Sequence, residues 1–416
     1  MSAPSPQSAR RTVRITIVLL FAAWLVDYAD RLVINLVLPS LGAEFGLSRG
    51  QQGLIVSAFF LAYALAQIPG GMLADRYGAR RVTLWALLAW SVFTALTGFA
   101  WSFVVLLVLR FVFGAAEGVF PPAALKVLVE RTRPDERMAA NGLIMSSNAI
   151  AGVLTPLLVA PLIAVFGWRS AFFSTAALGV FVLVAVRMRL PAPRPRTEPA
   201  TGPVRTGIGD VLRLGVVWRF SAMMFGYSAI VWGFNTWVPS YLGEEFGLSL
   251  TAAGALMAVP ALAAAGGTVI GGRISDRLGG HHRKVILPAM TVAAFALLLV
   301  AFSSSLTGFV VFGTVASVAV SLCYMPVFAV PLSGLAPERV GVGSAVIVLG
   351  GQVAGMAAPP LVGALADAFS FRVAFASLVL GAGIAAAMAL LTPQDAASFR
   401  TATGVSDLPE PAKESA

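Results

Sequence analysis

The sequence predicts an all-α membrane protein with twelve transmembrane helices in two pseudo-symmetric six-helix bundles. Of the 416 residues, 58% are hydrophobic and only 12% are charged, whereas about a quarter of the residues in a soluble domain are charged. Two segments also read alike at an offset of 201 residues, because Glu44–Ser48 and Glu245–Ser249 are both Glu-Phe-Gly-Leu-Ser. In so apolar a chain, a repeat of this length is typical of secondary transporters built from two similar membrane halves.

Twelve apolar runs are long enough to cross a bilayer, which takes roughly 20 helical residues. Helices are expected because they satisfy their own backbone hydrogen bonds in lipid, and the many Gly and Ala residues let neighbouring helices approach closely. Several runs are separated by only a few residues, which predicts helical hairpins. The runs lie at residues 15–39, 53–74, 82–101, 103–125, 139–165, 171–190, 217–242, 251–272, 285–303, 307–332, 341–366 and 373–392.

These runs divide the chain into an N-terminal bundle, residues 15–190, and a C-terminal bundle, residues 217–392. The interval 191–216 is rich in Pro, Arg, Thr and Gly without apolar periodicity, so we expect a flexible cytoplasmic linker. Residues 1–14 and 393–416 form an N-terminal and a C-terminal tail. No interval has room for a soluble domain, which argues against a membrane receptor or an enzyme.

The net charge of +10 is explained by membrane topology and does not indicate a nucleic-acid partner. Most Lys and Arg residues lie in the tails and in the loops on one side of the predicted spans. Only Arg49, Arg169 and Arg372 lie on the other side, and Arg31 and Arg110 lie inside spans. This bias predicts an integral protein of a bacterial cytoplasmic membrane, with both termini in the cytoplasm.

Five charged residues lie in the interior of predicted spans, away from the span ends, where each charge costs at least a few kcal/mol. Asp27, Asp30 and Arg31 lie in the first span, and Arg110 and Glu117 lie two helical turns apart in the fourth. The four-residue spacing of Asp27 and Arg31 allows an ion pair, while Asp30 points elsewhere. One interpretation is that the five residues only lock the two helices together, although buried ion pairs rarely add net stability. The other is functional, since guanidinium groups suit anion binding and buried carboxylates bind protons.

The segment Gly71-Met72-Leu73-Ala74-Asp75-Arg76-Tyr77-Gly78-Ala79-Arg80-Arg81 resembles the loop motif of the major facilitator superfamily, with a weaker copy at residues 272–279. The resemblance covers residues 15 to 392 and implies transport by alternating access. If the motif served only to anchor the cytoplasmic side with positive charge, this would explain its arginines but not its aspartate or its spaced glycines. The resemblance implies a gating role for Gly71, Asp75, Arg76, Gly78, Arg80, Arg81, Gly272, Asp276 and Arg277.

Three shorter motifs resemble the anion:cation symporter family, which includes bacterial sugar-acid transporters and the animal sialin and vesicular glutamate carriers. They are Tyr28-Ala29-Asp30-Arg31, Arg110-Phe111-x-x-Gly114-x-x-Glu117-Gly118 and Phe234-Asn235-Thr236-Trp237-Val238-Pro239-Ser240-Tyr241-Leu242. The resemblance implies that Asp30 and Glu117 couple protons and that Arg31 binds the substrate carboxylate. Asp27 lies outside the family pattern and is a third candidate for proton coupling.

The other candidates for substrate binding are Tyr28, Arg110, Asn148, Gln352, Tyr227 and Trp237. Asn148 stands where bacterial sugar-acid carriers often have Gln, and Gln352 stands where Asn is common. Both changes keep an amide but alter its reach, so they bear on the choice of substrate.

The predicted function is proton-coupled symport of a small organic anion, such as a sugar acid or an aromatic acid. The partners are then the anion, the proton and membrane lipid, and we expect a monomer without cofactor, metal or nucleic acid. An alternative is a proton-driven drug or metabolite exporter of the same superfamily, whose span-5 motif Gly152-Val153-Leu154-Thr155-Pro156 matches only in part. The same residues also allow sodium in place of protons, and exchange in place of symport.

Overall fold

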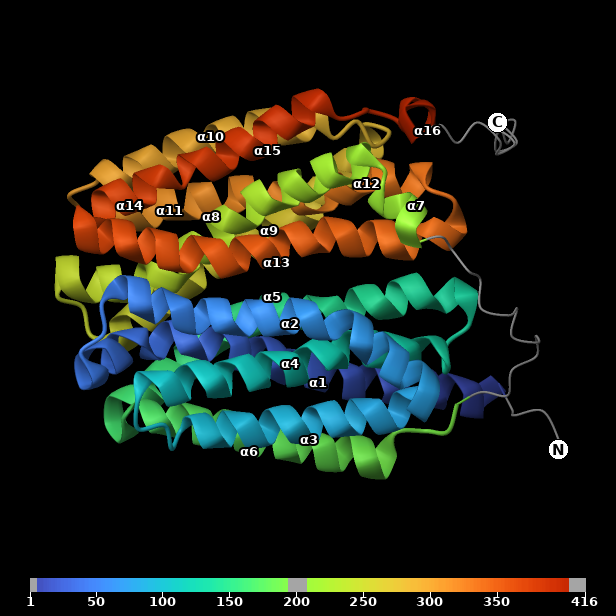
Figure 1. Ribbon diagram of the computed structural model, residues 1–416, viewed down its shortest axis with the longest axis horizontal. Coiled ribbons are helices and arrows are strands. Elements are labelled where there is room, and N and C mark those ends of the chain that lie inside the picture. Colours follow the sequence, from blue (N-terminus) through green and yellow to red (C-terminus); the bar gives the residue numbers. More distant parts are fainter. Residues whose placement is uncertain (1–5, 194–207, 404–416) are drawn as a thin grey trace. The chain divides into compact units, whose positions relative to one another are not determined.

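The computed structural model describes residues 6–193 and 208–403, and every regular element among them is a helix (Figure 1). The first repeat contributes α1 (Pro6–Phe45), α2 (Arg49–Tyr77), α3 (Ala79–Thr97), α4 (Phe103–Val129), α5 (Pro134–Phe166) and α6 (Trp168–Arg189). The second contributes α7 (Ile208–Leu212), α8 (Gly215–Phe246), α9 (Leu250–Arg277), α10 (Arg283–Phe302), α11 (Leu306–Leu322), α12 (Tyr324–Gly334), α13 (Pro337–Ala368), α14 (Phe371–Ser377), α15 (Val379–Leu391) and α16 (Ala396–Thr403).

Each of the twelve predicted spans coincides with helical structure, which confirms the predicted fold class. Among the described residues, nine helices are long and apolar enough to cross a membrane by length and composition. The tenth span is divided into α11 and α12 at Cys323, where Pro326 cannot donate a backbone hydrogen bond to the preceding turn. The twelfth is divided into α14 and α15 at Leu378. The short helices α7 and α16, in the predicted linker and tail, were not expected from the sequence.

The two repeats end their first long helix in the same way. Gly46 and Gly247 have φ angles of +63° and +62°, a left-handed conformation that glycine adopts at little cost. The amide of the next residue bonds back to the helix, from Leu47 N to Gly42 O at 3.0 Å and from Leu248 N to Leu242 O at 3.2 Å. The repeated sequence therefore encodes a repeated helix end.

The chain forms two compact units, and each is described by itself. Unit 1 comprises Met1–Pro199, Trp232–Leu262 and Gly355–Ala374, and unit 2 comprises Ala200–Val231, Ala263–Ala354 and Phe375–Ala416. The boundaries between the units include positions within α8, α9, α13 and α14. The predicted bundle bounds at residues 190 and 217 therefore stay a prediction. In unit 1, α2 and α3 pack along α4, α5 packs along α1, and α6 packs along α3. In unit 2, α10 packs against α11 and α15.

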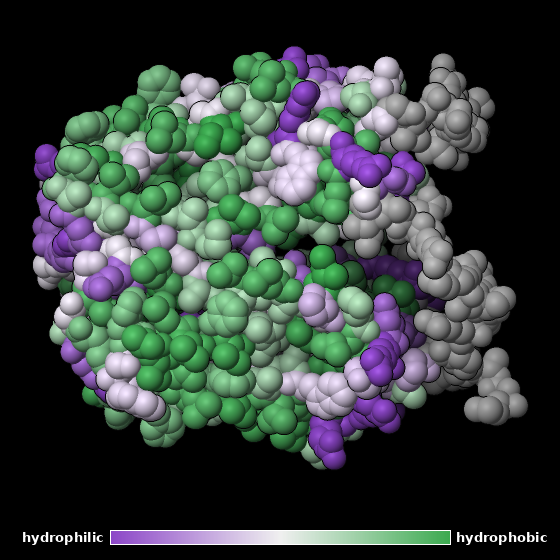
Figure 2. Space-filling model, in the orientation of Figure 1, coloured by the Kyte–Doolittle hydropathy of each residue, from purple (hydrophilic) through white to green (hydrophobic). Residues whose placement is uncertain are grey.

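The core of unit 1 is built from large buried side chains, including Trp90, Phe113, Phe120 and Phe172. On the face that Figure 2 shows, hydrophobic residues cover the middle of the surface and hydrophilic residues gather toward its two ends. Large hydrophobic side chains such as Phe181 of α6 are exposed. This pattern is typical of helices that face lipid.

Candidate functional site

The five charged residues of α1 and α4 lie together in the interior of unit 1. The exposed fraction is 0% for Asp27, Asp30 and Glu117, 1% for Arg110 and 9% for Arg31. Charges this deeply buried require partners, because the loss of hydration is not otherwise compensated. The partners of each side chain therefore define the site.

Arg31 lies between two carboxylates. Its Nη2 atom is 3.4 Å from Asp27 Oδ2 on the same helix and 3.3 Å from Glu117 Oε2 on α4. The pair with Asp27 is the one that the four-residue spacing allows. Glu117 contacts Arg31 although Arg110 is the cation that precedes it by two turns on its own helix. The guanidinium of Arg31 therefore forms ion pairs with two carboxylates.

Aromatic rings surround the guanidinium of Arg31. Its Cζ atom lies 4.6 Å from the ring centre of Tyr63, 5.1 Å from that of Phe59 and 5.7 Å from that of Tyr28. The negative face of an aromatic ring attracts a cation, so these rings help to keep the group charged inside the protein. Sequence reasoning missed Phe59 and Tyr63, although their four-residue spacing places both on one face of α2.

Asp30 points away from Arg31, as expected for its neighbour in a helix. Thr94 of α3 donates a hydrogen bond from its hydroxyl to Asp30 Oδ2. Thr94 was also missed, and a run of fully buried hydroxyl residues along α3, which includes Thr83 and Thr97, is the signal that could have revealed it.

Arg110 has no carboxylate within ion-pair distance in the part of the chain that the structure describes. Its guanidinium packs against Phe113 and Phe172, with 4.8 and 4.9 Å from Cζ to the ring centres. Its Nε and Nη2 atoms are buried without a hydrogen-bond partner among these residues. Arg110 therefore has two buried donor atoms available for a ligand, and Arg31 has one, its Nε.

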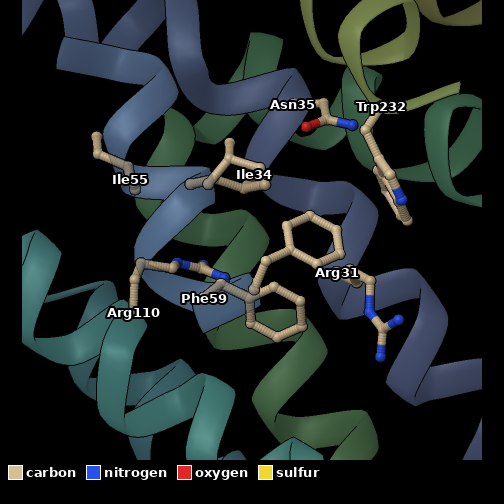
Figure 3. Close-up of a pocket in the computed structure, with 9 residues that line it drawn as sticks. Arg31, Ile34, Asn35, Ile55, Phe59, Arg110 and Trp232 are labelled. Carbon is tan, nitrogen blue, oxygen red and sulfur yellow. The ribbon is translucent and has the colours of Figure 1, made fainter. Parts of the chain in front are cut away.

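A cavity of about 10 Å³ lies against both arginines (Figure 3). Space of this size holds roughly one water molecule. Its polar wall is formed by Arg31, Arg110 and Asn35, and Asn35 is one helical turn beyond Arg31 on α1. Aromatic and aliphatic residues of α1, α2 and α8, among them Trp232, form the rest.

The remaining predicted substrate-binding residues are spread over both units. In unit 1, half-buried Tyr28 contacts Arg31, and Asn148 of α5 has a buried Oδ1 atom without a partner among the described residues. Trp237 is fully buried and donates from Nε1 to Pro359 O at 2.9 Å, so it packs α8 against α13. Tyr227, which stacks on Tyr324, and Gln352 belong to unit 2. Their part in binding stays a prediction.

The first copy of the loop motif lies where α2 ends in unit 1. Asp75 Oδ1 is 2.6 Å from Lys126 Nζ of α4, and the same ammonium group donates to Ala74 O at 3.0 Å. Lys126 thus caps the end of α2 while it pairs with the aspartate. Sequence reasoning singled out Asp75 but did not name this lysine.

The other motif residues have different surroundings. Arg80 donates to Arg187 O of α6 at 2.7 Å, and Arg76 lies over the ring of Tyr77. Gly78 turns the chain into α3 with a φ angle of +88°. Gly71 lies on α2, and Arg81 is exposed on the first turn of α3. In unit 2, Gly272, Asp276 and Arg277 lie in the last turns of α9.

No group of three or more His, Cys, Asp or Glu side chains is placed to hold a metal ion, as far as the described residues reach. The arginines, carboxylates and hydroxyl group described above offer ion pairs, hydrogen bonds and proton transfer.

The family model of the Major Facilitator Superfamily matches residues 19–287. A probable sulfoacetate transporter of Cupriavidus necator is 30% identical over 88% of this chain and 90% of its own length. A hexuronate transporter of Bacillus subtilis is 28% identical over 76% of this chain and 77% of its own. A bacterial homolog of the human lysosomal transporter Spinster has a similar fold, with a TM-score of 0.82, 20% identity and coverage of 96% of this chain and 99% of its own. The chain therefore belongs to the major facilitator superfamily, whose members are integral membrane transporters.

Proposed function

We propose that the protein is a secondary active transporter that moves a small organic anion together with protons by alternating access. We place it in a bacterial cytoplasmic membrane with both termini in the cytoplasm. The observation that carries the proposal is the position of Arg31, whose Nη2 atom is shared by the buried carboxylates of Asp27 and Glu117. A buried cation shared by two carboxylates links the binding of an anion to the binding of a proton.

The link follows from charge balance. When both carboxylates are ionised, one guanidinium leaves an excess negative charge in a region of low dielectric constant, so a proton on either carboxylate is favoured. A substrate carboxylate that pairs with Arg31 displaces Glu117 or Asp27 from it. The displaced group then loses its counter-charge and takes up a proton. Release of the substrate reverses both events, so proton and anion cross together.

Arg110 provides a second contact for the anion. Its Nε and Nη2 atoms lack partners among the described residues, and it lies against the same cavity as Arg31. Guanidinium groups bind carboxylate and sulfonate oxygens through paired N–H donors. Tyr28 and Asn148 supply further polar groups in unit 1. Asp30, bonded to Thr94, is a candidate for proton coupling beside Glu117 and Asp27.

Sequence relatives support an organic acid as the substrate. Besides the sulfoacetate and hexuronate transporters, the relatives include a probable galactarate/D-glucarate transporter of Escherichia coli, 30% identical over 64% of this chain and 67% of its own length. Each of these named substrates is an acid that is anionic at neutral pH. We therefore propose a carboxylate or a chemically similar acid, with the single chain as the transport unit.

The loop motifs tune the transition between states in this proposal. The pair of Asp75 and Lys126 joins α2 to α4, away from the charged site. In the proposed topology, these helix ends lie on the cytoplasmic side. A change there should alter the rate of transport and not the choice of substrate.

Uptake by the purified protein in proteoliposomes tests the proposal. A panel of sugar acids, aromatic acids, dicarboxylates and sulfonates is presented with an inward proton gradient, with a sodium gradient and with neither. We expect at least one acid to accumulate only with the proton gradient, and a protonophore to abolish the accumulation. Protein-free liposomes are the control. Accumulation driven by sodium alone, or proton-driven movement of cationic drugs and of no acid, would contradict the proposal.

A further inference from the structure

Most of the wall of the cavity beside the two buried arginines is hydrophobic. Six of the nine residues that line the cavity are hydrophobic, among them Ile34 of α1, Phe60 of α2 and Trp232 of α8. All nine belong to unit 1. A hydroxyl group that faces this part of the wall finds no hydrogen-bond partner in exchange for the water it gives up, so the wall favours an apolar ligand group.

The aromatic part of the wall is held in place by its own packing. Phe60 and Trp232 meet edge to face, with 4.7 Å between the ring centres. The ring of Phe60 also lies over Gly355 of α13, where an added Cβ atom would be 2.7 Å from three of the ring carbons. Phe59 packs against Phe113, with 5.5 Å between the ring centres. Rings packed in this way resist displacement, so the wall keeps its aromatic character when a ligand enters.

Asn35 is the exception in this wall. Its side chain lines the cavity and is only 3% exposed, yet its amide forms no hydrogen bond with the residues that the structure describes. An amide offers both donors and an acceptor, and a buried amide without partners costs stability. Figure 3 shows this amide apart from the guanidinium groups of Arg31 and Arg110. Asn35 is therefore an isolated polar point that a ligand can complete.

The spacing along α1 relates this polar point to the proposed anion site. Asn35 follows Arg31 by four residues, which is a rise of about 6 Å along the helix. An acid whose anionic group lies at the arginines therefore extends toward Asn35 with the hydrophobic wall beside it. A sugar acid carries several hydroxyl groups, and one amide can bond only one or two of them. The others would lose their hydrogen bonds with water against hydrophobic side chains.

We propose that Asn35 decides which acid is carried, and that the substrate is an aromatic acid with one further polar group, a hydroxyl or a carbonyl. The ring of the acid packs on the wall that contains Phe60 and Trp232, and its polar group bonds the Asn35 amide. The inference rests on the proposed function, which places the acid group at Arg31 and Arg110. It deepens that function, since it selects aromatic acids and excludes sugar acids.

Binding of labelled acids to the purified full-length protein in detergent tests the substrate class. The probes are benzoate, its three monohydroxy isomers and D-galacturonate, each a monoanion with a six-membered ring. The three isomers present one hydroxyl group in three directions. We expect at least one hydroxybenzoate to bind roughly tenfold more tightly than benzoate and roughly a hundredfold more tightly than galacturonate. Scintillation proximity measures the dissociation constants.

Asn35→Leu tests the role of the amide, because leucine has a similar size and no polar atoms. We expect the affinity for the preferred hydroxybenzoate to fall roughly tenfold, while the affinity for benzoate stays within about twofold. A misfolded protein would lose both acids and cannot give this pattern. Asn141→Leu is the matched control, since Asn141 is a half-buried residue of α5 outside the cavity lining. It should change neither affinity.

A second variant covers the case in which Asn35→Leu binds neither acid. Asn35→Ala adds no atoms to the cavity, so it removes the amide without a steric clash, and the same change in the ratio of the two affinities is expected. An unchanged ratio in the variant that binds benzoate would overturn the role of Asn35. If neither variant binds benzoate although Asn141→Leu does, the amide has a structural role and the inference is also overturned.

The outcomes for the native protein separate this inference from the proposed function. If galacturonate binds as tightly as every hydroxybenzoate, or if none of the five probes binds while another acid is taken up with the proton gradient, the substrate class is wrong and proton-coupled anion transport stands. If no acid binds and none is taken up with the proton gradient, the proposed function fails and this inference fails with it.

Discussion

At the scale of single residues, the site is governed by the competition of two carboxylates for Arg31. Asp27 and Glu117 contact the same Nη2 atom from different helices, at 3.4 and 3.3 Å. Neither contact is short, and the guanidinium also lies over the ring of Tyr63. An arginine held in this way keeps its charge but can exchange one partner for another, which is what a coupled binding site requires.

Glu117→Gln should separate exchange from net transport. The amide resembles the protonated acid, so the variant cannot release the proton that drives accumulation. We expect uptake driven by a proton gradient to fall by roughly two orders of magnitude, while substrate exchange across the membrane continues within about threefold of the native rate. Both activities are measured with labelled substrate in the same proteoliposomes.

Asp27→Asn is the matched comparison, since it alters the other partner of the same nitrogen atom. If Glu117→Gln retains full pH-driven accumulation and Asp27→Asn or Asp30→Asn loses it, the proton travels through α1 instead of α4.

Arg31→Ala should abolish substrate binding. The change removes the counter-charge of the substrate and also leaves two buried carboxylates without a cation, which typically costs 2–5 kcal/mol, or roughly 30- to 5,000-fold in affinity. Titration calorimetry of the detergent-purified variant measures the loss. Arg189→Ala, at an exposed position in the last turn of α6, is the control and should bind normally. A dissociation constant near the native value in Arg31→Ala would exclude this residue as the substrate clamp.

At the scale of helices, charged clamps at the helix ends orient the elements that carry the site. Arg169 of α6 donates to both carboxylate oxygens of Glu44, at 3.0 and 2.7 Å, and Trp168 Nε1 donates to the same group at 2.6 Å. This arrangement joins the end of α1 to the start of α6. Since α1 bears three of the five buried charges, the clamp helps to fix their depth in unit 1.

Glu44→Gln should lower the thermal stability of the protein in a pH-dependent way. The hydrogen bonds from Arg169 and then Trp168 lower the pKa of Glu44 below its ordinary value of 4.5. A lowered pKa adds stability that is present above pH 4.5 and lost as the pH falls through the folded-state value. The clamp is partly exposed, so we expect a loss of about 1 kcal/mol at pH 7.

Melting temperatures in detergent at pH 7 and near pH 3.5 check this expectation. The difference between the native protein and Glu44→Gln should shrink at the lower pH. Glu245→Gln is the control, because Glu245 has the same place in the second repeat but forms no ion pair among the described residues. An equal and pH-independent loss in both variants would show that the clamp does not act through its charge.

At the scale of the whole molecule, the repeat and the charge bias together predict the topology. Two copies of one motif set, 201 residues apart, place equivalent loops on the same side of the membrane. We expect the basic loops to lie in the cytoplasm, because translocation of Lys and Arg is disfavoured.

Single-cysteine labelling in the Cys323→Ala background measures this orientation. Ser249→Cys, in the exposed turn before α9, should react with an impermeant maleimide in intact cells, and Thr401→Cys, exposed on α16, should react only after permeabilisation. The reverse pattern would invert the predicted topology.

The sequence by itself determined the helical spans, the repeat and the set of buried charges. Each of these features can be recognised from a short stretch of sequence. The length of an apolar run indicates the length of a span, and Gly46 and Gly247 mark a helix end. An isolated Asp or Arg within an apolar run indicates a polar site. Helix periodicity also brings Asp27 within reach of Arg31, since both lie on one element. The small helices α7 and α16 were missed because they lack an apolar run.

Only the tertiary structure decided which partners these residues find on other helices. Glu117 contacts Arg31 across two helices and not Arg110 on its own, Thr94 bonds Asp30, and Lys126 pairs with Asp75. The close approach of Gly53 to Pro359 and Pro360 of α13, some 300 residues later in the chain, could likewise not be read from the sequence. The physical reason is that periodicity specifies the direction of a side chain from its own axis. It does not specify which helix packs there, or at what depth and rotation, and those quantities follow from the packing of the whole set of helices.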